Sequence, residues 1–205
     1  MAAQRGFDRV VNLSDAVVAI AATLLVLPLV DSAADIQRMS AVELLAEHWT
    51  ELFAFALSFT VICRFWLVHH AVYARLEGYS AGLLWANFLW LLSIAFLPFP
   101  TELVAFSGID DPAVSATYIG TMVVSTGAMT LQLLIAVRNP ALQTEATRGS
   151  LRLAPSLVAL GSLILALVVA VVFPSIGLWA ILLMVPAGYV QRAVSERRDR
   201  AVAAG

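Results

Sequence analysis

Long runs of apolar residues alternate with short polar segments along the whole chain. The runs are about 15 to 25 residues long, and a helix of roughly 20 residues crosses a hydrocarbon core about 30 Å thick. The pattern therefore predicts a single all-α transmembrane domain, residues 1–205, with six spanning helices at residues 10–30, 52–73, 83–99, 113–137, 153–173 and 176–190.

The polar segment after the first run has a periodicity of its own. Between residues 34 and 48, apolar side chains recur every three positions, at Ile36, Met39, Val42 and Leu45, with charged residues between them. Such spacing is typical of a short amphipathic helix that lies on a membrane surface. We therefore expect residues 34–48 to form a surface helix.

The composition agrees with a chain that lies mostly in lipid. Hydrophobic residues make up 61% of the 205 residues and charged residues only 13%, against about 25% charged in soluble domains. The net charge of −2 carries no signature of nucleic-acid binding. We expect the lipid bilayer as a partner and no nucleic acid.

The reactive side chains do not form a recognisable catalytic or metal-binding group. Cys63 is the single cysteine, which excludes an intramolecular disulfide and a cysteine-based metal site. An enzyme needs a nucleophile with a base, or a cluster of metal ligands. The pair His69-His70 has no carboxylate in the same run. The sequence therefore predicts no enzyme, no cofactor and no tightly bound metal.

The arginines indicate the orientation of the spans. With the N-terminus inside, eleven of the 12 basic residues fall on or near the cytoplasmic side, and Arg38 alone falls outside. Cytoplasmic loops of membrane proteins carry an excess of arginine and lysine. We therefore expect both termini in the cytoplasm and the acidic loops on the outer side.

Several polar side chains lie inside the first three predicted spans, where each needs a partner or water. They are Ser14 and Asp15 in the first span, Arg64, Trp66, His69 and His70 in the second, and Asn87 in the third. If the spans pack together, Asp15 can pair with an imidazole, with an indole N–H or with Arg64. Two interpretations stay open: a hydrogen-bonded lock between helices, and a proton relay that uses the histidines.

The first span also has a second, apolar face. At 100° per residue, Ile20, Thr23, Leu24 and Leu27 lie within about 60° of one another, and Asp15 lies about 140° from Ile20. A stripe of this kind most often indicates ordinary packing between helices.

Three motifs in these spans, in this order, resemble a known family. They are Arg9-Val-Val-Asn-Leu13-Ser14-Asp15, Arg64-Phe65-Trp66 followed by His69-His70, and Trp85-Ala86-Asn87 followed by Phe96-Leu97-Pro98-Phe99-Pro100-Thr101. They are similar to the first three helices of the endosomal/lysosomal potassium channel family, transmembrane protein 175 and its bacterial relatives. Leu13 stands where that family has phenylalanine. Residues beyond the third span resemble the family only in length and order.

The resemblance implies a potassium-selective channel, leaky to other monovalent cations, without a P-loop filter. In that family the first helix lines a central pore with a hydrophobic constriction. Carried over by position, Ile20 is the constriction, Thr23 a polar layer beside it, and Leu24 and Leu27 further apolar rings. One motif copy per chain implies a homotetramer, in the plasma membrane of a bacterium. Arg9, Ser14, Asp15, Arg64, Trp66, His69 and Asn87 are the expected motif and network residues.

The alternative function is a proton-conducting channel or a proton-coupled transporter that uses Asp15, His69 and His70. It draws on the same polar residues and stays open at this point.

Overall fold

The computed structural model describes residues 2–32, 40–108, 111–173 and 175–183. In order along the chain, the α-helices are α1 (Ala2–Leu24), α2 (Leu27–Ser32), α3 (Ala41–Glu47), α4 (Trp49–Tyr73), α5 (Ala81–Phe96), α6 (Pro98–Ser107), α7 (Pro112–Arg138) and α8 (Ala154–Val172). Short 3-10 helices follow at Pro140–Leu142, Glu145–Thr147 and Gly177–Leu183. The chain is an all-α membrane protein, as predicted.

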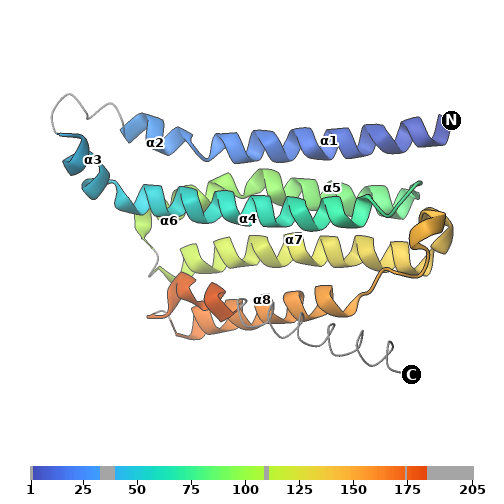
Figure 1. Cartoon of the computed structure of the whole chain (residues 1–205). Helices are drawn as coiled ribbons and strands as arrows, with labels where there is room; N and C mark the ends of the chain where they lie inside the picture. The colour runs from blue at the N-terminus through green and yellow to red at the C-terminus, as the bar shows by residue number, and fades with distance from the viewer. Residues whose placement is uncertain (1, 33–39, 109–110, 174, 184–205) are drawn as a thin grey trace, which may run out of the picture.

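The long helices lie side by side in layers (Figure 1). Helix α1 forms one edge and packs against α4 and α5. Helix α7 packs against α5 on one side and against α8 on the other. Buried aromatic and aliphatic side chains fill the layers in two clusters, one with Trp90 and Ile62, and the other with Tyr118 and Leu163.

Five helical segments of the described residues are long and apolar enough to cross a membrane. They are Gly6–Asp31, Trp49–Tyr73, Ala81–Ser107, Pro112–Arg138 and Ala154–Val172. In the region of the sixth predicted span, residues 176–190, the structure shows a 3-10 helix at Gly177–Leu183, and residues 184–190 lie outside the described part.

The helical path of the third span continues beyond the predicted end at residue 99, past Pro98 and Pro100. Helix α5 ends at Phe96, but α6 begins at Pro98 and carries the path on to Ser107. Proline is tolerated in the first turn of a helix, because the N–H it lacks has no intrahelical partner there. Leu97 joins the two helices, and its N–H donates to the carbonyl of Ile94 (3.1 Å).

The surface helix is shorter in the described residues than the predicted range 34–48. Helix α3 begins after Ser40, whose hydroxyl accepts from the Glu43 N–H while the Glu43 carboxylate accepts from the Ser40 N–H (2.8 Å). This capping box explains the start of the helix. The same bonds lower the pKa of Glu43 from its usual value, mainly through the Ser40 backbone N–H. Residues 33–39 lie outside the described part.

Candidate functional site: the first helix and its polar support

Helix α1 has one packed side and one uncovered side. Its packed side faces α4 and α5. On the other side the apolar side chains of Ile20 and Leu24 are exposed by 59% and 42%, and Leu27, which follows in α2, is exposed by 52%. They form the stripe that the sequence singled out. Within one chain, therefore, nothing among the described residues covers the predicted pore face.

Thr23 is the polar member of this exposed stripe. Its hydroxyl donates to the carbonyl of Ile20, one turn earlier (2.9 Å). Because the hydrogen is used within the helix, the oxygen lone pairs stay available to accept from water or to contact a cation. Thr23 thus offers an acceptor directly beside the apolar side chain of Ile20.

The helix breaks immediately after this position. Residues 25 and 26 form a turn between α1 and α2, where the Val26 N–H donates to the carbonyl of Thr23 (3.3 Å). Pro28 has no N–H to offer the carbonyl of Leu24. Irregular backbone at membrane depth is tolerated where it is buried in protein or lines water. The break separates Leu27 from the rest of the stripe on α1.

Asp15 pairs with the indole, one of the three partners that the sequence left open. The Trp66 Nε1–H donates to Oδ1 of Asp15 (2.8 Å) and so ties α4 to α1. The Trp66 ring stacks on His70, with centroids 5.3 Å apart. His69 does not share this contact, because its ring nitrogen has a different partner.

A second chain of hydrogen bonds joins three helices behind the stripe. His69 Nε2 bonds to Oδ1 of Asn87 (3.0 Å), and Nδ2 of Asn87 donates to the hydroxyl of Ser14 (3.0 Å). Ser14 in turn donates to the backbone carbonyl of Val10 (2.9 Å). His69, Asn87 and Ser14 are each exposed by 1% or less. The chain fixes α1 against α4 and α5.

The two arginines of the motif do not join this network within one chain. Arg9 and Arg64 are both exposed. Among the described residues, the only ion pair is that between His48 and Glu51 (3.1 Å). The possible pairing of Asp15 with Arg64 is therefore not formed, because Arg64 and the Asp15 partner Trp66 project from different sides of α4.

The sequence analysis missed a further set of buried polar contacts in the outer layers. Tyr73 donates to Gln132 (2.7 Å), and Ser58 bonds to Tyr118 (2.9 Å) and accepts from Thr101 (2.7 Å). Gln132 within the apolar fourth run was the available signal. Serine and threonine gave no clear signal, because they also bond to carbonyls of their own helix.

Acidic side chains gather near the outer end of α2. A cavity of about 230 Å³ lies there, lined in part by Asp31, His48, Glu51 and Glu102. Carboxylates near a pore mouth raise the local concentration of cations. Within the described residues, no group of three or more His, Cys, Asp or Glu side chains is arranged to hold a metal ion.

The fold and this site define a multi-pass helical membrane protein whose first helix is held by a polar lock and presents an uncovered apolar face. Residues 9–98 match the sequence model of the family described as endosomal/lysosomal potassium channel TMEM175. That match spans 90 of the 205 residues, less than half of the chain, and it contains the exposed stripe and both hydrogen-bonded chains.

Two curated proteins are similar to about half of the chain. The chain is 35% identical to a potassium channel of Chamaesiphon minutus over 98 residues, which is 47% of this chain and 48% of that protein. It is also 35% identical to a potassium channel of Streptomyces collinus over 97 residues, 47% of each. The alignment spans about half the length of these curated relatives.

The fold similarity extends further than the sequence similarity. The crystal structure of a lysosomal potassium-selective channel TMEM175 homolog from Chamaesiphon minutus matches with a TM-score of 0.61 and 24% identity. The match covers 90% of this chain and 99% of that one. The arrangement of helices beyond residue 98 therefore also agrees with that fold.

Proposed function

We propose that the chain is one subunit of a potassium-selective, monovalent cation channel, leaky to other monovalent cations, and that α1 lines its central pore. The observation that carries the proposal is the exposed stripe of Ile20, Leu24 and Leu27 with Thr23 among them. Both curated relatives are named potassium channels. The proposal involves no catalysis and no cofactor, since the permeant ion itself is the ligand.

The chemistry of the stripe accounts for selectivity without a loop of carbonyl groups. Isoleucine cannot replace the hydration shell of an ion, so a ring of Ile20 side chains restricts conduction by excluding water when it is narrow. Potassium loses part of its shell more easily than sodium does. A ring of Thr23 hydroxyls can replace part of the lost water.

A homotetramer supplies the ring that this mechanism needs. Each chain carries one copy of the motif and one exposed α1 stripe, so several chains must converge to enclose a pore. The relatives are bacterial, and the distribution of arginines along the sequence favours an orientation with the N-terminus inside. We accordingly propose a bacterial plasma membrane as the location, with both termini in the cytoplasm.

The proton-relay alternative receives less support from the hydrogen bonds. The chain that starts at His69 passes through the amide of Asn87 and ends on the backbone carbonyl of Val10. Neither group takes up and releases protons near neutral pH. Asp15 is bonded to an indole, which donates only. The arrangement favours a lock that holds the pore helix.

The proposal is tested by ion flux in proteoliposomes of the purified chain. With a potassium gradient and a proton-sensitive dye, we expect potassium-dependent flux that is larger than the flux with a sodium gradient. Flux driven by a proton gradient alone, unchanged when potassium is removed, would instead support the relay. Absence of flux with every cation would contradict both.

Substitution of Thr23 by alanine is expected to lower the potassium over sodium permeability ratio several-fold while conduction persists. The hydroxyl that offers its lone pairs to the permeant ion is lost, but the apolar ring remains. Reversal potentials under bi-ionic conditions measure the ratio. Thr117→Ala in α7 is a matched control, since that hydroxyl also bonds to a carbonyl of its own helix (2.7 Å). An unchanged ratio in Thr23→Ala would remove Thr23 from the filter.

A further inference from the structure

Helix α4 carries an exposed charge inside a membrane span. Arg64 lies nine residues before Tyr73, the last residue of α4, which is roughly 13 Å from the inner end at 1.5 Å per residue. At 100° per residue, Thr60, Arg64, Leu67 and Ala71 lie within about 60° of one another, and all four are exposed. We call them the α4 face.

Among the residues that the structure describes, none pairs with the charge on this face. Arg64 lies about 160° around α4 from Trp66, the residue that bonds to Asp15. A charged side chain in the bilayer is costly on the lipid side, and such residues almost always face protein or a water-filled space. The α4 face therefore needs to pack against protein or to face water, and the described part of one chain provides no such contact.

Helix α5 has an exposed face of complementary character. Trp85 (73% exposed), Phe88 (44%), Leu92 (68%) and Phe96 (45%) lie within about 80° of one another. Asn87, which bonds to His69, lies on the opposite side of α5. We call these four residues the α5 face. Aromatic rings attract a guanidinium group over their faces, more strongly where water is excluded.

The two faces also match in depth. The 3.0 Å contact between His69 and Asn87 indicates that these two residues lie at about the same depth along the helix axes. Because α4 and α5 run in opposite directions, Arg64 lies level with Leu92, five residues further out on each helix. Phe88 and Phe96 lie one turn, about 6 Å, to either side of Leu92. Rotation about an axis along the membrane normal leaves these depths unchanged.

We propose that the α4 face of each chain packs against the α5 face of the next copy, with Arg64 over the aromatic rings of α5. The inference rests on the proposed channel, in which α1 points to a common axis. Helices α4 and α5 both pack on α1, so each presents its free face to a neighbouring copy. Contacts between two different faces continue around a ring until it closes.

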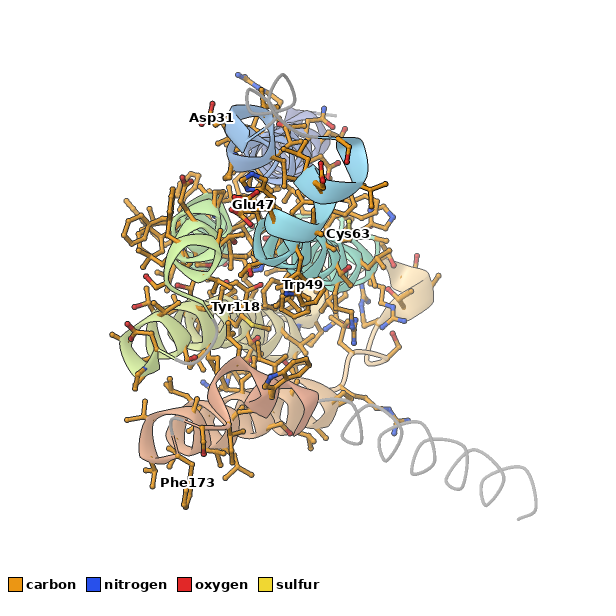
Figure 2. The ribbon with its side chains drawn as sticks, turned by 90° about the vertical axis from the view of Figure 1, so that its left-hand side faces the viewer. Asp31, Glu47, Trp49, Cys63, Tyr118 and Phe173 are labelled. Carbon is orange, nitrogen blue, oxygen red and sulfur yellow. The ribbon has the colours of Figure 1, made fainter. Side chains whose placement is uncertain are left out.

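The single cysteine provides a direct test. Cys63 is half-buried beside Arg64 on α4 (Figure 2) and lies nearly level with Leu92. In the full-length chain in liposomes, Leu92→Cys should give disulfide-linked dimers, trimers and tetramers upon mild oxidation. There are three controls. The first is the unmodified chain, which has Cys63 alone, and the second is Leu92→Cys combined with Cys63→Ser. The third is Val168→Cys, on the exposed side of α8, with Cys63 kept. Each should stay monomeric on a denaturing gel.

The outcomes separate this contact from the channel function. A ladder that ends at the tetramer supports the interface even if the liposomes carry no potassium flux, in which case only the proposed function fails. Dimers alone would overturn the proposed interface, and so would the absence of a crosslink in protein that conducts. Arg64 would then contact lipid or another protein surface.

The charge itself is tested by a pair of substitutions. Arg64→Gln is expected to lower the tetramer fraction several-fold in native mass spectrometry from mild detergent, and Arg64→Lys should retain most of it, because a lysine ammonium also binds aromatic rings. Equal tetramer fractions in Arg64→Gln and the unmodified chain would contradict the role of Arg64. An equal loss with lysine and glutamine would also contradict it.

Discussion

Replacing Ile20 with asparagine is expected to raise potassium conduction about tenfold and to bring the potassium over sodium ratio close to one. The side chain is 59% exposed on the face of α1 that we propose lines the pore, so an amide there would hydrate the proposed constriction. If four amides lower the dehydration barrier by about 1.4 kcal/mol, the passage rate rises about tenfold. Flux and reversal potentials in proteoliposomes measure both effects.

The matched control for this variant is Ile164→Asn in α8. Ile164 is also an exposed isoleucine of a spanning helix, at 46%, but it lies in the layer furthest from α1 (Figure 1). We expect conduction of Ile164→Asn to stay unchanged. If Ile20→Asn conducts and selects like the unmodified chain, the stripe is only a packing surface.

Replacing Asn87 with leucine is expected to destabilise the chain by about 2 kcal/mol, because buried groups that lose a hydrogen-bond partner cost about 1–3 kcal/mol. Asn87 bonds to His69 on α4 and to Ser14 on α1, so one substitution leaves both without it. Hydrogen bonds between membrane helices are on the order of 1 kcal/mol each, which agrees with this figure. The expected drop in the melting temperature in detergent is about 4–8 °C.

A serine on the outer layer serves as the control for this stability measurement. The Ser162 hydroxyl donates to the Val158 carbonyl of its own helix (2.9 Å), so Ser162→Ala breaks no bond between helices. Its melting temperature should match that of the unmodified chain. A melting temperature of Asn87→Leu within error of this control would show that the chain from His69 to Ser14 does not hold the helices together.

The sequence predicted that polar side chains of the first three helices bond to one another, because such side chains are rare in apolar runs and must find partners. Asp15, Trp66, His69, Asn87 and Ser14 do so, but Arg9 and Arg64 are exposed. The sequence could not choose the partner of Asp15. That choice depends on the rotation of α4, which places Trp66 toward α1 and Arg64 away from it. Ile20 and Leu24 share an exposed side of α1, as their helical spacing predicted, whereas Leu27 lies in α2, beyond the turn at residues 25 and 26.

Features that depend on local backbone geometry were harder to predict. The first span was predicted as continuous over residues 10–30, and only the structure shows the turn at residues 25 and 26 and the restart of the helix at Leu27. The third span was predicted to end at residue 99, whereas α6 begins at Pro98 and continues to Ser107. The contacts of the hydroxyl groups on α7 could not be predicted from the pattern of polar and apolar residues. A threonine such as Thr121 can also bond to a carbonyl of its own helix (2.8 Å).

The central claim, that α1 lines the pore, is tested most directly by cadmium block of a cysteine placed at Thr23. In a Cys63→Ser background, Thr23→Cys positions four thiols around a common axis, and soft thiolate ligands bind such a metal ion tightly. Potassium flux should stop at micromolar cadmium and recover with a chelator. The background protein and Val168→Cys should be insensitive. Full flux through Thr23→Cys in cadmium, with block of Val168→Cys, would contradict the account and place the pore elsewhere.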